Sequence, residues 1–232
     1  HIKLSTEYGG KTQLNLGHLV NAEREQRGDG FELRTDSWGA IRAGKGLFIT
    51  TDKQDKAGGD VLAMEEAIQQ LEQALSIARN LSNSAEISGT AASDLDAQEQ
   101  LKNNLSQLTA PGLLVHAPEG IGVFTPKPIS IGSGQESIAI SASKSINLSA
   151  NKTLTINAEN DANIYAQHNG IKAFAKYGNI DVEAQNDAMS LLSKQDLKVQ
   201  SIDGKVHITA GQEIILTCGG AYIKISDGNI EL

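Results

Sequence analysis

Hydrophobic residues recur in pairs with a period of eight along residues 137–164, which read SIAISASK, SINLSANK, TLTINAEN and DANI. The two apolar residues of a pair stand two positions apart, and a small or polar stretch follows them. This alternation predicts a short strand with one buried face, and the Ser, Asn, Asp and Lys residues between strands predict turns. The pairs are Ile138/Ile140, Ile146/Leu148, Leu154/Ile156 and Ala162/Ile164.

The same pairs recur on both sides of this stretch, at spacings of eight or nine residues. An occasional ninth residue fits a turn that tolerates one insertion. Toward the C-terminus the pairs are Ile171/Ala173, Ile180/Val182, Met189/Leu191, Leu197/Val199, Val206/Ile208, Ile214/Leu216 and Ile223/Ile225. Near the N-terminus they are Phe31/Leu33, Gly39/Ile41 and Leu47/Ile49.

A helical pattern interrupts the repeat in the sequence DVLAMEEAIQQLEQALSIARNL, residues 60–81. Its apolar residues stand three or four positions apart, which predicts a helix with one packed face. A turn in SNSAEISGTAA follows, with a break at Gly89. The residues of the packed face are Val61, Met64, Ile68, Leu71, Leu75 and Ala78.

A second helix is predicted to start at Ser93, with Asp96 placed for a capping box. Pro111 and Gly112 end it. One face of this helix carries Leu95, Leu101, Leu105 and Leu108. The chain is therefore expected to consist of an N-terminal β-repeat block over 1–59, a helical hairpin insertion over 60–111, and a C-terminal β-helix or β-prism shaft and tip over 112–232.

Strands this short need stacked neighbours to pair their backbone groups and to bury their apolar stripe. An octad spans one side of a small coil, and a closed coil needs about three sides. Either one chain supplies three successive octads or three chains supply one each. The repeat continues to Leu232 without a polar cap, and the helical insert is a common association device, so we expect three chains.

The predicted fold is thus mainly β: a homotrimeric, intertwined triple-stranded β-helix or β-prism with an inserted α-helical hairpin. The residues expected in its core stripe are Ile138, Ile140, Ile146, Leu148, Leu154, Ile156, Ile164, Val206, Ile208, Ile214, Leu216, Ile223 and Ile225.

Charge and composition narrow the class of partner. The chain of 232 residues has a formal net charge of −8, which argues against nucleic acid and anionic membrane as electrostatic partners. It has one cysteine and therefore no intrachain disulfide. Its aromatic content of 4% suits a repetitive scaffold better than an aromatic-lined pocket.

Candidate chemistry is sparse, so we expect no enzyme activity, no catalytic or metal site and no cofactor. Ser141–Lys144 and Ser149–Lys152 match an S-x-x-K signature, but that chemistry needs a helix and both fall in strand–turn repeats. Under three-fold symmetry His168 or Cys218 could meet its copies on the axis. A solvated His168 and a buried, inert Cys218 are the favoured interpretations.

Four stretches resemble the C-terminal half of VgrG proteins, the spikes of bacterial type VI secretion systems. They are GFELRTDSWGAIRAGKGLFITTD, DVLAMEEAIQQLEQAL, TAPGLLVHAPEGIGVFTPKPISIGSG and CGGAYIKISDGNIEL. The resemblance covers essentially the whole chain and implies a trimeric β-prism. The inner positions are mostly Ile and Leu, and the valine–glycine repeat of the family name is absent. The family's N-terminal hub and small barrel are expected to be missing, and no effector domain is expected after Leu232.

The resemblance implies a mechanical function. The spike would assemble in the bacterial cytoplasm, join the tube protein through the missing N-terminal part, puncture a target-cell envelope with transient passage through membranes, and be secreted with effector cargo. A sharpening protein of the PAAR-repeat type would cap the tip. The candidate contacts for it are Tyr222, Lys224, Asp227, Asn229 and Glu231.

Two other functions fit the sequence less well. A monomeric solenoid binding module, such as an adhesin stalk or carbohydrate binder, would close each coil with three octads of one chain. The few dispersed aromatic residues count against it. A hydrolase of envelope polymer would need paired carboxylates in a pocket, and the repeat leaves no room for one.

Overall fold

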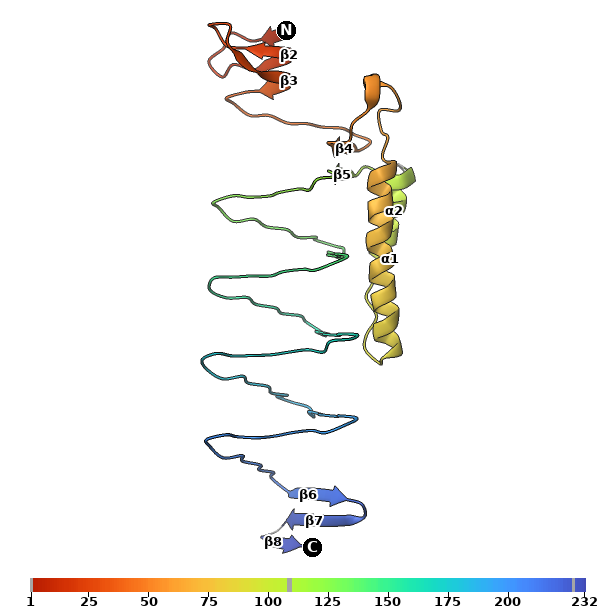
Figure 1. Ribbon diagram of the computed structural model, residues 1–232, viewed down its shortest axis with the longest axis vertical. Helices are drawn as coiled ribbons and strands as arrows, with labels where there is room; N and C mark the ends of the chain where they lie inside the picture. The colour runs from red at the N-terminus through yellow and green to blue at the C-terminus, as the bar shows by residue number, and fades with distance from the viewer. Residues whose placement is uncertain (1, 108–109, 227) are drawn as a thin grey trace. The chain divides into compact units, whose positions relative to one another are not determined.

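The computed structural model describes residues 2–107, 110–226 and 228–232 and separates into two units, His1–Ile171 and Lys172–Leu232. Among the described residues, the first unit holds five strands and two α-helices, and the second holds three strands (Figure 1). Long stretches of both units are extended chain without regular secondary structure.

The N-terminal residues form an antiparallel sheet in the order β1 (Ile2–Ser5), β2 (Gln13–Val20) and β3 (Gln26–Arg34). The predicted pair Phe31/Leu33 lies in β3, opposite Leu16 and Leu14 of β2. The sequence pattern did not predict β1 and β2. Their apolar residues alternate as expected for a strand, but they do not follow the octad spacing on which the prediction was based.

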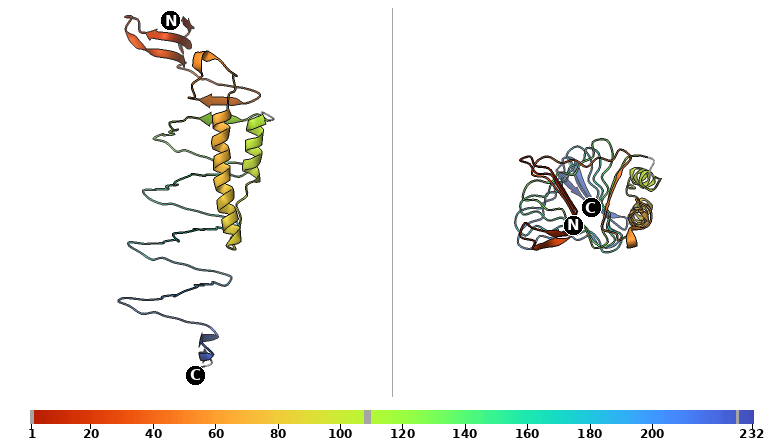
Figure 2. Two further views of the ribbon diagram at one scale, coloured as in Figure 1. Left: turned by 45° about the vertical axis from the view of Figure 1, so that its right-hand side comes forward. Right: turned by 90° about the horizontal axis from the view of Figure 1, so that it is seen from above.

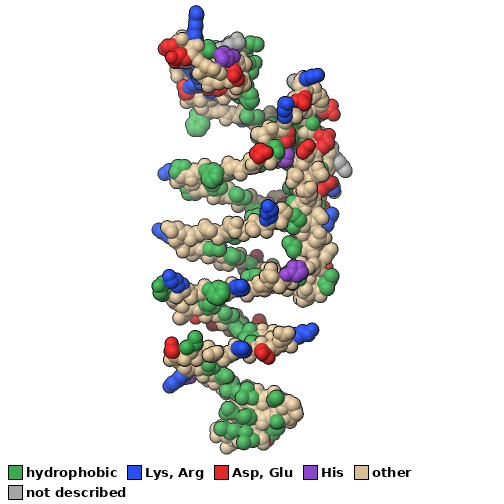
Figure 3. Space-filling view, in the orientation of Figure 1, with side chains coloured by type: hydrophobic (Ala, Val, Ile, Leu, Met, Phe, Trp, Pro, Cys, Tyr) green, Lys and Arg blue, Asp and Glu red, His purple; other side chains and the backbone are tan. Residues whose placement is uncertain are grey.

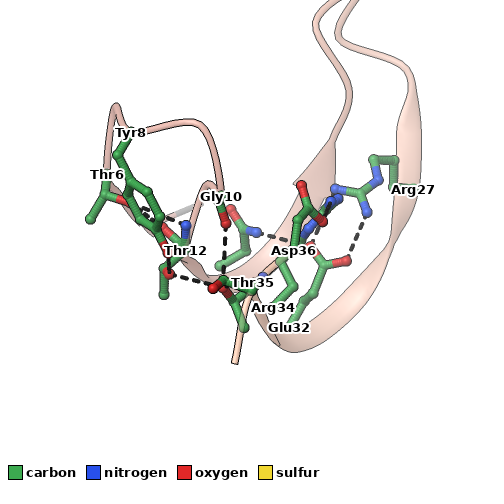
Figure 4. A network of polar contacts seen from close by, with 11 residues as sticks. Thr6, Tyr8, Gly10, Thr12, Arg27, Glu32, Arg34, Thr35 and Asp36 are labelled. Atoms are coloured by element: carbon green, nitrogen blue, oxygen red, sulfur yellow. Dashed lines mark hydrogen bonds and ion pairs between the residues drawn. The ribbon is translucent and has the colours of Figure 1, made fainter. Parts of the chain in front are cut away.

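Polar contacts hold this sheet together within one chain (Figure 4). Asn15 donates a 2.9 Å hydrogen bond to Glu32, and Arg27 donates another of 2.9 Å to the same carboxylate. The Arg27 hydrogen bond lowers the pKa of Glu32. At the other end, Thr12 donates to Thr35 at 3.1 Å, and Thr35 donates to the Gly10 carbonyl at 3.3 Å. This part of the chain therefore satisfies its own polar groups.

Strands β4 (Leu47–Thr50) and β5 (Leu113–His116) pair in parallel, with Leu47 opposite Leu113 and Thr50 opposite His116. The predicted pair Leu47/Ile49 lies in β4, whereas Gly39/Ile41 lies in no strand. A short 3₁₀ turn, η1 (Asp55–Ala57), and the two α-helices lie between β4 and β5 in the chain. The helices are thus an insertion between two paired strands.

The hairpin consists of α1 (Glu65–Ile87) and α2 (Asp96–Gln107), which lie side by side in both views of Figure 2. The buried residues Ala67, Leu75, Ala85 and Leu105 provide its core. Arg79 forms an ion pair with Glu99, and Lys102 lies 3.7 Å from Glu72. A core and two ion pairs between the helices make the hairpin a self-contained element.

The first helix is shifted toward the C-terminus relative to the prediction. Val61 precedes α1 and is 94% exposed, so it is not part of the packed face. The helix continues through residues 82–87, which the sequence predicted as a turn. Serines are tolerated there because the Ser84 hydroxyl donates to the Asn80 carbonyl four residues back and the Ser82 hydroxyl accepts the Ser93 N–H. The chain leaves the helix at Gly89, as predicted, with φ of +83°.

The second helix begins at Asp96 and not at Ser93. Asp94 accepts the N–H of Asp96 at 3.1 Å, so this carboxylate occupies the capping position expected for Ser93, whose N–H is bound to Ser82. Leu105 is buried as predicted, but Leu101 is 51% exposed and Leu95 precedes the helix. Leu108 lies outside the described residues.

Residues 117–212 are extended and turn at intervals of eight or nine residues. The octad pattern predicted this spacing. The turns lie at 118–119, 126–127, 134–136, 143–144, 151–152, 159–160, 167–169, 176–178, 185–187, 194–195, 202–204 and 211–212. Among these described residues no segment pairs with another as a strand.

The second unit ends in an antiparallel sheet of β6 (Glu213–Cys218), β7 (Ala221–Ser226) and β8 (Asn229–Glu231). The sequence prediction treated Tyr222–Leu232 as one last strand, but the chain reverses there into two. Gly228, with φ of +76°, supplies the left-handed backbone that a tight turn requires.

Candidate assembly surface

The predicted core stripe lies open in the single chain. Its members before residue 209 are between 50% (Val206) and 75% (Ile156) exposed, and hydrophobic side chains lie along the successive passes of extended chain (Figure 3). Large apolar side chains in such number are rarely left exposed, because each forfeits about 1.5–3 kcal/mol of burial. The stripe therefore has the character of an interaction surface.

The backbone of the same stretch is unpaired as well. Between the described residues 117–212 one backbone–backbone hydrogen bond forms, from the Gly120 N–H to the Ala117 carbonyl in a turn. Extended chain with free N–H and C=O groups on both edges is a template for further strands. The apolar stripe and the unpaired backbone edges thus occur on the same residues, up to Ile171 in the first unit and from Lys172 in the second. We call these residues the candidate assembly surface.

Contacts between the hairpin and the extended chain show how this chain winds in the first unit. Leu114 of β5 and Met64, the residue before α1, line one cavity. Three turns later the chain returns to the hairpin, where Ser137 lies 3.5 Å from Asp94. After three more turns Tyr165 Oη lies 3.2 Å from Ser88 Oγ, at the other end of α1. One circuit therefore takes three sides, as the octad length suggested.

Each circuit of the extended chain advances by a large distance along α1. Helix α1 has 23 residues, which gives a length of about 35 Å at ~1.5 Å per residue. The two circuits between Leu114 and Tyr165 cover this length. If each circuit paired with the next, two circuits would rise by only about 10 Å at ~4.8 Å per strand. With two additional strands inserted in each circuit the rise would be about 29 Å, which is far closer to the length of α1.

The candidate tip residues lie on the C-terminal sheet. Tyr222 donates a 2.5 Å hydrogen bond to Glu231, and Lys224 forms a 2.9 Å ion pair with Glu213. These contacts raise the pKa of Tyr222 and of Lys224, through Glu231 and Glu213 respectively. Asn229 pairs with Ser226 in the ladder, and Asp227 lies outside the described residues. Four of the five predicted residues, Tyr222, Lys224, Asn229 and Glu231, thus share one polar face.

The strand pairing places apolar residues opposite one another in this sheet. Ile214 faces Ile225, Leu216 faces Ile223, and Ile225 also faces Ile230. Because side chains alternate along a strand, these residues lie on the face opposite Tyr222 and Lys224. One face is therefore apolar and the other charged.

A structural pair that the sequence analysis missed joins β4 to β5. The His116 Nδ1 lies 2.7 Å from the Asp52 carboxylate, which also accepts a 2.6 Å hydrogen bond from Thr50. The Thr50 hydrogen bond, followed by that of His116, lowers the pKa of Asp52. The parallel pairing of Thr50 with His116 brings the three together, and no spacing in the sequence could indicate it.

The other candidate residues gather into no site. Lys144 and Lys152 lie in turns of the extended stretch and not on a helix, so the S-x-x-K chemistry lacks its framework. Cys218 is exposed in the single chain. Within the described part of the chain no group of three or more His, Cys, Asp or Glu residues could hold a metal ion. Neither helix there is both long and apolar enough to cross a membrane.

A helical hairpin inserted into a three-sided coil of extended segments is typical of one class of proteins, the β-repeat shafts. Comparison with known proteins gives the family. A model described as a putative type VI secretion system Rhs element Vgr matches residues 1–85, and one for an uncharacterized protein conserved in bacteria (DUF2345) matches residues 100–232. The chain belongs to the VgrG spike family, and the resemblance seen in the sequence is confirmed.

Solved structures agree with this assignment. A VgrG spike from the type VI secretion system shares 49% identity over 99% of this chain and 87% of its own, with a TM-score of 0.95. A VgrG spike solved with the Tle1 effector bound also gives 49% identity and a TM-score of 0.95, over 71% of its length.

Two proteins of Pseudomonas aeruginosa PAO1 are similar over parts of their length. The type VI secretion system spike protein VgrG2b is 32% identical over 96% of this chain, and VgrG2a is 46% identical over 33% of it. The matches span 23% of VgrG2b and 9% of VgrG2a. The chain thus corresponds to a minor part of these relatives.

Proposed function

We propose that this chain is a structural, non-enzymatic segment of a type VI secretion spike, which punctures target-cell envelopes and carries effectors. The observation that carries the proposal is the candidate assembly surface of residues 117–212, unpaired along both edges and apolar along one stripe. A VgrG spike with a bound Tle1 effector supports the effector-carrying part. No residue of this chain is assigned to that cargo.

The working form is a homotrimer, an intertwined triple-stranded β-prism. The rise of the circuits along α1 leaves room for two more strands per circuit, which favours two further copies over a coil closed by one chain. In this arrangement the core stripe faces the axis, and every extended segment pairs with a neighbouring copy on each edge. The three parts are the β-repeat block over 1–59, the hairpin over 60–111, and the shaft and tip over 112–232.

Such a trimer suits mechanical load. A strand cannot detach without breaking hydrogen bonds to two other chains, and the acidic net charge of −8 keeps the shaft from adhering to anionic lipid. The spike is assembled in the bacterial cytoplasm on the tube protein and then secreted. A PAAR-repeat protein would cap the C-terminal sheet, with contacts among the predicted residues Tyr222, Lys224, Asp227, Asn229 and Glu231.

Light scattering across a dilution series tests this proposal. The expected result is a constant mass of three times the 24.6 kDa of one chain. A mass of one chain would overturn the proposal and favour the monomeric solenoid binding module, in which each coil closes alone.

A further inference from the structure

Among the described residues, the side of α1 that faces the extended chain approaches its own chain at three levels. These are β5 at the start of the helix, residues 136–141 at its middle and Tyr165 at its end. Over about 35 Å of helix there is room for about seven strands at ~4.8 Å spacing. Two strand levels in each interval are therefore vacant along α1.

The surface of the hairpin beside its own chain is apolar and not fully covered. One cavity of about 580 Å³ is lined by Leu71, Ala74 and Leu101 and by the small residues Ser137, Ala139 and Ser141. A second cavity, of about 470 Å³, lies beside Ala78 and Leu81. Leu81 itself is 52% exposed. The charged residues Glu72 and Arg79 of α1 are instead paired with α2.

The distribution of charge along the shaft indicates what covers this face. The extended segments level with the hairpin contain no Asp, Glu, Lys or Arg; they are 121–125, 128–133, 137–142, 145–150, 153–158 and 162–166. Beyond residue 171 charges appear in four of the five corresponding segments, at Lys172, Asp181, Glu183, Asp196, Lys198 and Lys205, and segment 188–193 carries none.

A hairpin that covered only its own chain would not explain this distribution. Every third segment, such as 137–142, returns to the hairpin of the same chain, and of the next segment Ile146, directly after the turn, lines the same cavity as Leu81. Segments 145–150 and 153–158 lie on the other two sides, yet they are equally free of charge. In a three-fold assembly the hairpins of the other two copies lie on those sides, and each segment at this height would be covered by one hairpin.

We infer that the hairpin of each copy is a clamp in trans, whose α1 packs across segments 145–150 and 153–158 of the two other copies. This inference rests on the proposed trimer. At ~1.5 Å per residue, one strand level of ~4.8 Å corresponds to three to four residues of α1, so Leu81 lies at the level of Asn147 of one neighbour and Ser84 at the level of Thr155 of the other. Ser88 then meets Tyr165 of its own chain, as observed.

Cysteine cross-linking in the full chain tests the clamp, with Cys218→Ser as background. The test pairs are Leu81→Cys with Asn147→Cys, and Ser84→Cys with Thr155→Cys. The matched control is Ser88→Cys with Tyr165→Cys. Each variant is oxidised or treated with a short bismaleimide, and its products are separated under denaturing, non-reducing conditions. Disulfides require Cα atoms within about 7 Å, and the bismaleimide extends this reach.

The clamp predicts covalent trimers for both test pairs, because every hairpin is joined to a neighbour, and a cross-linked monomer for the control. Cross-linked monomers in the test pairs, or no cross-link while the control reacts and the mass remains that of three chains, would overturn the clamp and leave the proposed function standing. A mass of one chain in the uncross-linked background would overturn both.

Discussion

The hairpin and the extended stretch of residues 117–212 belong to one chain but solve the same physical problem in opposite ways. In the hairpin, backbone groups are paired within α1 and α2, and Leu75 is 2% exposed. In the extended stretch, backbone edges are bare and Leu148 is 66% exposed. The comparison shows that the hairpin buries its apolar residues within one chain, whereas the extended stretch leaves its apolar stripe exposed, which supports the proposal that this stretch folds by assembly with other copies.

The largest effect is expected from a charge in the stripe. Leu148→Asp would place three carboxylates at one level of the axis, and burying one unpaired polar group alone costs roughly 2–7 kcal/mol. We expect loss of the trimer, measured as mass by light scattering. The matched control is Ser190→Asp, at a position between the paired apolar residues Met189 and Leu191, which the octad pattern places on the outer side of the strand. It should leave the mass and the melting temperature unchanged. A Leu148→Asp trimer with the melting temperature of the original protein would contradict the register.

A smaller effect is expected from the hairpin core. Leu75→Ala removes a fully packed side chain and should destabilise the hairpin by about 2–5 kcal/mol. The helical circular dichroism signal should be lost at a lower temperature than in the original protein, while the mass stays that of three chains. Ile87→Ala, at an 88% exposed position of α1, serves as control and should have little effect. Loss of the trimer in Leu75→Ala would mean that shaft and hairpin do not fold separately.

A charge beneath the proposed clamp should have a smaller effect than the loss of Leu75. Asn147→Lys would place a Lys stem under the hairpin of a neighbouring copy, with its ammonium forced toward the edge of the contact. We expect this to lower stability by about 1–3 kcal/mol per chain, the cost of burying a neutral polar group, because the ammonium itself stays partly hydrated. Ser190→Lys, in a segment beyond the reach of the hairpin, should be neutral. Denaturant unfolding of both variants measures the difference, and equal stabilities would argue against the clamp.

The smallest effect is expected on the stability of the protein in acid. The pKa of Asp52 is lowered in the folded protein, so the hydrogen bonds of its carboxylate to Thr50 and His116 contribute stability at any pH above the ordinary pKa of an aspartate. This contribution is lost as the pH falls through the lowered pKa. We expect the difference in melting temperature between the original protein and Asp52→Asn to be constant near neutral pH and to vanish in strong acid. A difference that does not depend on pH would show that charge at Asp52 is irrelevant.

The sequence predicted the parts of the fold that depend on local periodicity. Turns at intervals of eight or nine residues, the two helices and the break at Gly89 all follow from residue spacing. The end of α1 was misplaced because serines in residues 82–87 are poor helix formers in isolation and are satisfied here by Asn80 and Ser93. These two hydrogen bonds could not be predicted from the residue types alone.

Long-range pairing accounts for the remaining misses. The parallel pairing of β4 with β5 spans the whole hairpin in sequence, so the contact of Asp52 with His116 could not be inferred from spacing. Strands β1 and β2 were missed because their apolar residues do not follow the octad spacing. The core stripe and the tip contacts remain predictions, since a single chain holds neither the axis nor the partner.

Amide hydrogen exchange over residues 117–212 tests the central claim most directly, because it reports whether the backbone is paired. The account predicts strong protection at every extended segment in the trimer, comparable to α1, and loss of that protection in Leu148→Asp. Rapid exchange along this stretch in a particle with the mass of three chains would contradict the claim that other copies supply its hydrogen-bond partners.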